Sequence, residues 1–311
     1  MWLLILVLVL LLLVAFVALF AFHKAVDRPA PLDFGDKAAL MKSSWFAYEP
    51  LLTPAVQWVD QQPWQDVAIQ GADGVALHGL WLPADKADMA LLLFHGYASL
   101  PHNDFCLTAR WAKKKGYSVF LAQQRGYGKS GGSSTALGLL EAEDCRRWAA
   151  YFAEKLGPGV KLVLGGVSMG ATTVLFAASG PLPETVRALS VDCGYRSVKG
   201  VIKHIVKTYL RMRSFPLVQL VCLFGRLRWG VWPGKLDTVE IMKQNQRLPV
   251  FFAHGKADTT VPYTMTKEAY DACAAPKHLF TCEDAGHGAS ALVETERYFT
   301  EMEAFLKPYL V

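Results

Sequence analysis

The hydrophobic and polar positions divide the chain into an apolar N-terminal stretch, an irregular segment and a long region of regular alternation. Residues 1–22, MWLLILVLVLLLLVAFVALFAF, contain no charged residue, proline or glycine. About 20 apolar residues in a helix suffice to cross a bilayer core. No Lys or Arg precedes this stretch, and its exit, ALFAFHKA, is a poor cleavage site. It therefore predicts an uncleaved single-span anchor, with a secretory signal peptide as the alternative.

An irregular segment follows over residues 23–63. It contains five prolines, which interrupt regular elements. We interpret it as a connector. Its stretch AALMKSSWFAYEPLL, residues 38–52, is expected to form a short helix against either the membrane or the main domain.

From residue 64 to residue 311 the apolar positions alternate between the strand and helix periods, beginning with a hairpin turn at Ala72-Asp73-Gly74. Strands alternating with helices predict an α/β fold, with a mostly parallel central sheet and helices on both faces. Strands are expected at 66–71, 75–83, 89–97, 118–124, 160–166, 186–194, 248–255 and 277–284. Helices are expected at 103–117, 140–157, 170–179, 197–230, 262–274 and 291–310.

The composition adds little to this division. The chain is 52% hydrophobic, and the N-terminal stretch explains much of the excess. A net charge of +5 and the lack of a basic-aromatic motif give no indication of nucleic-acid binding. The six cysteines form no C-x-x-C pair or zinc-finger spacing, so they are expected to be buried free thiols. No metal or organic cofactor is implied.

Positive charge just after the span bears on membrane sidedness. Lys24 and Arg28 favour a cytoplasmic C-terminal domain under the positive-inside rule. Asp27 lies among these charges, and large domains translocate despite such a bias. The side of the membrane is therefore left open.

One serine lies between glycines directly after a buried strand. The segment VLGGVSMGA places Ser168 between that strand and a helix starting near Gly170. This strand-turn-helix context is the one that a nucleophile elbow requires. Gly166 and Gly170 leave room for a serine at positive φ, which predicts an exposed hydroxyl at the edge of the sheet.

A serine hydroxyl needs a base, and the base needs an acid that orients it. His287 in CEDAGHGAS follows the last short strand, and Asp258 in FFAHGKADTTVP follows the strand before it. The order Ser168, Asp258, His287 is the serine-acid-histidine order of this class of site. Asp192, which ends an earlier strand in SVDCGY, is the competing candidate for the acid.

An oxyanion site completes such chemistry. The segment LLLFHGYAS leaves the Tyr97 amide at the end of a strand, and the Met169 amide lies at the start of the next helix. We predict that these two amides form the oxyanion hole. His95 is interpreted as a structural residue of the loop.

These segments carry a resemblance to a known superfamily. FHGYAS, QQRGYGKSGG, GGVSMGA, AHGKADTTVP and DAGHG resemble successive landmarks of the α/β-hydrolases, in the branch described as serine aminopeptidase-like or lysophospholipase-like. The resemblance runs from about residue 64 to the C-terminus. It implies the α/β-hydrolase fold and a serine hydrolase. One departure is that Gln123 stands where the family usually has an acid, so Arg125 needs another partner.

A basic, apolar segment lies where this fold commonly inserts a lid. Residues 196–235 contain nine basic residues and no Asp or Glu. The segment is either a helical cap with a solvated basic face or a lid that faces anionic lipid and an acyl chain. A peptidase selecting free N-termini would need acids there, so esters are favoured over peptides.

The sequence thus predicts a membrane-anchored serine hydrolase that cleaves a carboxylic ester, such as an acyl ester or a lysophospholipid, through an acyl-enzyme. Its expected partners are a small acyl ester, which includes lipids, and the membrane. The alternatives are an aminopeptidase-like enzyme on the same fold and a catalytically silent membrane-bound scaffold.

Overall fold

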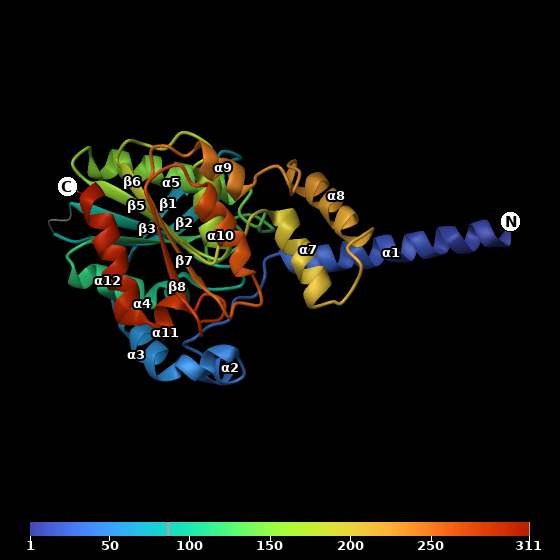
Figure 1. The fold of residues 1–311 in the computed structure, drawn as a ribbon, viewed down its shortest axis with the longest axis horizontal. Coiled ribbons are helices and arrows are strands. Elements are labelled where there is room, and N and C mark those ends of the chain that lie inside the picture. Colours follow the sequence, from blue (N-terminus) through green and yellow to red (C-terminus); the bar gives the residue numbers. More distant parts are fainter. Residues whose placement is uncertain (86–87, 311) are drawn as a thin grey trace.

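A computed structural model describes residues 1–85 and 88–310 of the chain. Its centre is an eight-stranded sheet with the order β1-β2-β4-β3-β5-β6-β7-β8 (Figure 1). β1 and β2 form the expected hairpin, β2 pairs antiparallel with β4, and all later neighbours are parallel. The strands are β1 Gln65–Gln70, β2 Ala76–Leu82, β3 Met89–Phe94, β4 Ser118–Gln123, β5 Lys161–Val167, β6 Val186–Asp192, β7 Val250–Gly255 and β8 Lys277–Cys282.

Helices cover both faces of this sheet (Figure 1). One apolar core lies under α5, α6, α9 and α10, and the other lies under α3, α4, α11 and α12. Every residue of β3 and β7 is buried, as expected for strands covered on both sides. The predicted α/β class is confirmed. The helices around the sheet are α4 Pro101–Lys114, α5 Glu141–Leu156, α6 Met169–Ala177, α9 Thr238–Gln244, α10 Tyr263–Ala272, α11 Ser290–Val293 and α12 Thr295–Leu306, followed by the 3-10 turn η2 Lys307–Tyr309.

The segment after the N-terminal helix contains more helix than its prolines suggest. It forms α2 Lys37–Met41, the 3-10 turn η1 Ser44–Tyr48 and α3 Glu49–Asp60. Pro50 lies in the first turn of α3, where its missing N–H costs nothing, and Pro54 lies inside the helix. Burial of Leu52, Val56 and Val59 against the main domain stabilises α3 despite Pro54. The segment is therefore packed on the core of the main domain.

The N-terminal helix α1, Trp2–Val26, projects from one end of the molecule (Figure 1). It is long and apolar enough to cross a membrane. Most of it is exposed, but Ala18, Phe22 and Val26 near its C-terminal end are buried. These residues pack toward α7, Val198–Thr208, and α8, Leu217–Trp229, which flank the base of α1. We call residues 196–235 the lid; its expected single helical stretch is two helices joined by a loop.

Candidate active site

Ser168 lies in the sharp turn between β5 and α6. Its φ of 54° and ψ of −113° place it in a conformation that non-glycine residues rarely adopt. A Cβ on Gly166 would lie 2.3 Å from the carbonyl of Gly170, and one on Gly170 would lie 1.7 Å from the Phe94 carbonyl oxygen. Both glycines are thus required for α6 to start against the ends of β3 and β5. The turn holds the Ser168 hydroxyl at the carboxyl edge of the sheet.

Ser168, His287 and Asp258 form one chain of hydrogen bonds. The Ser168 Oγ lies 2.8 Å from Nε2 of His287, and Nδ1 of His287 lies 2.7 Å from Oδ2 of Asp258. A carboxylate only accepts, so Nδ1 carries the proton and Nε2 is left to accept from the serine. The three predicted residues, which come from three separate loops, therefore meet with the tautomer that proton abstraction requires.

Asp258 is held in its ionised form. Burial alone would raise its pKa, but hydrogen bonds from His254 and His287 hold the pKa well below the ordinary value. The Val261 amide adds to this effect and donates to Oδ1 over 2.9 Å, beside the Thr260 amide at 2.8 Å. The carboxylate is consequently a permanent negative charge beside the imidazole of His287.

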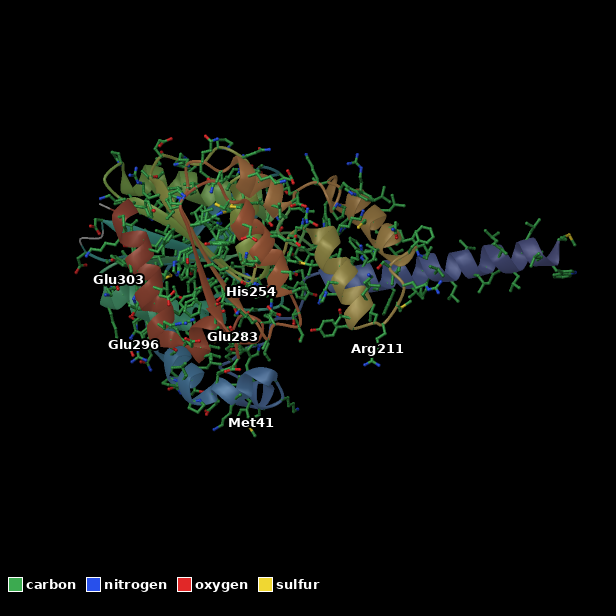
Figure 2. The ribbon with its side chains drawn as sticks, in the orientation of Figure 1. Met41, Arg211, His254, Glu283, Glu296 and Glu303 are labelled. Carbon is green, nitrogen blue, oxygen red and sulfur yellow. The ribbon has the colours of Figure 1, made fainter. Side chains whose placement is uncertain are left out.

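His254 is a residue that the sequence reasoning missed. It lies near the carboxyl end of β7, the strand between β6 and the edge strand β8 (Figure 2), and is fully buried. Its Nε2 lies 3.1 Å from Oδ2 of Asp258 and 3.0 Å from the Val261 carbonyl, so this nitrogen donates. Its Nδ1 lies 2.8 Å from Oγ1 of Thr266. The segment FFAHGKAD contained the signal, because His254 ends a buried strand four residues before Asp258.

Asp192, the competing candidate for the acid, has other partners. Its Oδ1 accepts from the Ser290 hydroxyl over 3.1 Å, and its backbone oxygen accepts from the Ser168 amide over 2.8 Å. Burial raises the pKa of Asp192 to about 6. In the described part of the chain, Asp258 and not Asp192 supplies the carboxylate that bonds to His287.

The two predicted oxyanion amides belong to segments that adjoin Ser168. The tight contact of Gly170 with Phe94 brings the start of α6 against the loop that follows β3. A Cβ on Gly96 would lie 3.5 Å from the Cβ of Ser168. Within the described residues, neither the Tyr97 nor the Met169 amide has a hydrogen-bond partner. Both are therefore free to bind a substrate oxygen.

Two side chains shape the loop that carries Tyr97. His95 is fully buried, its Nδ1 lies 2.7 Å from the Gly96 carbonyl, and its Nε2 accepts from the Gln124 amide over 3.3 Å. Burial lowers the pKa of His95 to about 4, so it is neutral and structural. Asp104, which the sequence reasoning did not single out, accepts from the Gly96 amide over 2.6 Å and from the Ser99 hydroxyl over 2.6 Å.

Arg125 pairs with two other acids in place of the acid that is missing at position 123. Its guanidinium binds both oxygens of Asp144 at 2.7 Å and one oxygen of Asp73 at 2.8 Å. Gln123 Oε1 instead accepts from the Lys129 amide over 2.7 Å. The departure from the family pattern changes the loop's partners and leaves the site intact.

Two cavities meet at Ser168 and His287. The first, which we call the leaving-group cavity, has a volume of about 210 Å³ and is bounded by the segment after α1, the loop of Tyr97, α4 and α11. The second, which we call the apolar cavity, has a volume of about 470 Å³ and is bounded by α1, α7, α8 and the loop after Asp258. Sizes of about 300–1,000 Å³ are usual for small-molecule sites. The Ser168 hydroxyl is thus accessible from two cavities whose lining residues differ.

Cys193 lies beside the site with ligand atoms of Asp258 and His287 all within 4.8 Å of one another. Three such groups are a donor set for a metal ion. Burial and the nearby carboxylates of Asp192 and Asp258 raise the pKa of the Cys193 thiol well above its ordinary value, so it is not a thiolate. Asp258 and His287 are already bonded to each other, which leaves the set unsuited to a metal.

Comparison with known proteins agrees with this architecture. Residues 90–214 match the family described as the alpha/beta hydrolase fold. Esterase Pf2001 of Pyrococcus furiosus is 22% identical with a TM-score of 0.65, over 80% of this chain and 94% of the esterase. The protein therefore has the α/β-hydrolase fold.

The chain also resembles curated proteins over part of its length. The uncharacterized protein YqkD of Bacillus subtilis is 25% identical over 61% of this chain and 62% of its own length, so less than two thirds of YqkD is matched. An uncharacterized membrane protein of Saccharomyces cerevisiae is 27% identical over 51% of this chain and 50% of its own length. The names of these two relatives state no activity.

Proposed function

We propose that the protein is a membrane-anchored serine hydrolase that cleaves carboxylic esters. The observation that carries this proposal is the hydrogen-bonded chain from Ser168 through His287 to Asp258, which opens to an apolar cavity. The similar fold of Pf2001, which is named as an esterase, is consistent with it.

The geometry suits a two-step acyl transfer. His287 Nε2 takes the proton of Ser168 as Oγ attacks the ester carbonyl. The Tyr97 and Met169 amides stabilise the oxyanion of the tetrahedral intermediate. When this collapses, the alcohol leaves with the proton from His287, and the acyl group stays on Ser168. A water activated by His287 then releases the acid and restores the serine.

The residues that line the two cavities favour ester substrates over peptides with a free N-terminus. Of the described residues that line the two cavities, Asp104 is the only acid, and the Gly96 amide and Ser99 hydroxyl engage its two oxygens. Substrate ammonium groups would therefore find no free carboxylate. An apolar cavity of about 470 Å³ instead suits an acyl chain.

Membrane attachment is the second part of the proposal. It is supported by the length and apolar exterior of α1, and by the yeast relative being named a membrane protein. The basic residues of the lid would then lie close to lipid head-groups, where each adds about 1 kcal/mol of attraction to an anionic surface.

Fluorophosphonate labelling of the full-length protein tests the assignment. The wild type should label and hydrolyse short acyl esters, and Ser168→Ala should do neither. Asp258→Asn should lower turnover by about 10⁴, whereas Asp192→Asn should keep it. A panel of aminoacyl amides with matched acyl esters decides between peptidase and esterase. If Ser168→Ala labels at the wild-type rate, the assignment of Ser168 as the nucleophile is wrong. If the wild type does not label, a catalytically silent scaffold is favoured.

A further inference from the structure

The apolar cavity beside Ser168 has the N-terminal helix as one of its walls. Ala21, Phe22, Ala25 and Val26 of α1 line it on one side. The lid lines it on the other side, with residues of α7, α8 and the loop between them that include Val201, Ile205, Leu210, Leu217, Val221 and Trp229. A helix suited to cross the bilayer is thus also part of the wall that a substrate would touch.

The end of α1 is fixed to the catalytic domain by several contacts. The Tyr97 hydroxyl donates to the Ala25 carbonyl over 2.8 Å, and the Thr135 amide donates to the Val26 carbonyl over 2.9 Å. The rings of Phe22 and Trp229 are 5.4 Å apart. Tyr97 also carries one of the proposed oxyanion amides. These contacts therefore fix the end of α1 in position relative to Ser168.

The lining of the cavity selects an uncharged, apolar occupant. Among the described residues around it, the polar side chains are Tyr97, Ser168, Tyr195, Thr260 and His287, and there is no carboxylate, lysine or arginine. The serine and His287 lie at one end. An ester carbonyl bound at Ser168 would place its hydrocarbon chain between α1 and the lid.

The lining of the cavity reaches an exposed apolar part of the lid. Leu210 lines the cavity and is 52% exposed, and Met212 and Phe215 in the same lid loop are also exposed. Arg211 marks this loop on the side from which α1 projects (Figure 2). Exposed apolar side chains next to arginines and an apolar helix are the composition of a membrane interface.

We infer that α1 is one wall of the acyl-chain site, and that the substrate is an ester with a medium or long acyl chain taken from the bilayer. The inference rests on the proposed esterase function. α1 then has two tasks: it anchors the protein, and it forms with the lid the channel through which a lipid chain reaches Ser168.

Substitutions in the helix test this with the full-length protein in phosphatidylcholine vesicles. Ala25→Trp should fill the cavity from α1. Leu13→Trp introduces the same side chain about three turns away along the helix, where Leu13 is 56% exposed and outside the cavity lining, and serves as the control. The measured quantity is the ratio of kcat/KM for p-nitrophenyl decanoate to that for p-nitrophenyl acetate.

Ala25→Trp should lower this ratio about tenfold or more, because each excluded methylene forfeits a several-fold gain from burial. Leu13→Trp should keep the wild-type ratio. If Ala25→Trp does not fold, Ile205→Trp fills the same cavity from the lid and should lower the ratio in the same way.

The outcomes separate this inference from the proposed function. If Ser168→Ala still hydrolyses both esters, the proposed function fails. If Ser168 is required for hydrolysis but the cavity-filling variants keep the wild-type ratio, the inference about α1 is overturned. The proposed esterase function is then retained.

Discussion

At the scale of single residues, the environment of Asp258 is the feature most distinctive of this site. Its Oδ2 lies near two histidines, the mobile base His287 at 2.7 Å and the buried His254 at 3.1 Å. Two backbone amides bind Oδ1. The Asp258 carboxylate is thus held by partners other than His287. It can therefore orient His287 while its own position stays fixed.

Loss of His254 should weaken this arrangement. In His254→Leu, Asp258 loses one donor and its carboxylate is free to rotate away from His287. We expect kcat for a short ester to fall about tenfold, which corresponds to the loss of one hydrogen bond to a charged group, with little change in KM. His254→Gln, which retains a donor, should recover part of the rate. A wild-type kcat in His254→Leu would show that the bond has no role in turnover.

Asp192 gives a prediction on stability rather than activity. Burial raises its pKa to about 6, so above that pH the folded protein holds a buried charge that the unfolded chain carries in water. This lowers the free energy of unfolding as pH rises from about 4 to 6. Asp192→Asn should therefore be more stable than the wild type at pH 7.5, by up to about 3 kcal/mol.

The gain of Asp192→Asn should shrink as the pH falls from about 6 to 4 and vanish below about pH 3, where residue 192 is neutral in both variants, folded or unfolded. Urea unfolding at a series of pH values measures it. A gain that is independent of pH would indicate improved packing instead of relief of a buried charge.

At the scale of elements, the turn between β5 and α6 is set by backbone contact. Helix α6 starts so close to β3 that the positions of Gly166 and Gly170 have no space for a Cβ. The same closeness brings the Met169 amide and the Tyr97 loop beside Ser168. Nucleophile and oxyanion site therefore depend on one packing contact between a helix and two strands.

Gly170→Ala tests that contact. Its Cβ would lie 1.7 Å from the Phe94 oxygen, so α6 must shift. We expect the free energy of unfolding to fall by about 3 kcal/mol or more, together with loss of fluorophosphonate labelling. Gly159→Ala is the control, because nothing lies within 4 Å of its Cβ. Equal stability of the two variants in thermal unfolding would contradict the packing argument.

At the scale of the whole molecule, hydrogen bonds join the N-terminal segment and the lid to the domain that contains the sheet. α1 ends at Val26 and the chain then crosses the Tyr97 loop, where the Leu32 amide donates to the Ala98 carbonyl over 3.1 Å. In the lid, His204 Nε2 lies 3.0 Å from the carbonyl of Thr259, in the loop that carries Asp258. If α1 spans the membrane as proposed, membrane attachment is coupled to access to Ser168.

Membrane insertion of α1 is testable on the intact chain. The wild type should stay with the membrane pellet after alkaline carbonate extraction. Leu8→Arg combined with Leu12→Arg should release it, because two arginines make insertion less favourable by about 6 kcal/mol. Isoleucine at both positions is the control. Extraction of the wild type itself would refute a membrane-spanning α1.

Much of this architecture could be predicted from the sequence alone, because it depends on patterns among neighbouring residues. The hairpin at Ala72-Asp73-Gly74, the buried run of β3 and the apolar α1 are each determined by neighbouring residues. Ser168, Asp258 and His287 follow β5, β7 and β8. This placement is equally local, since parallel strands bring their carboxyl ends to one edge.

Only the tertiary structure decided features that depend on contacts between distant segments. α3 continues past Pro54 because its apolar face is buried on the sheet. The acid is Asp258 because the loop after β7, unlike the end of β6, brings a carboxylate within 2.7 Å of His287. The cavity between α1 and the lid joins residues some 200 positions apart, and no periodicity in the sequence encodes such a juxtaposition.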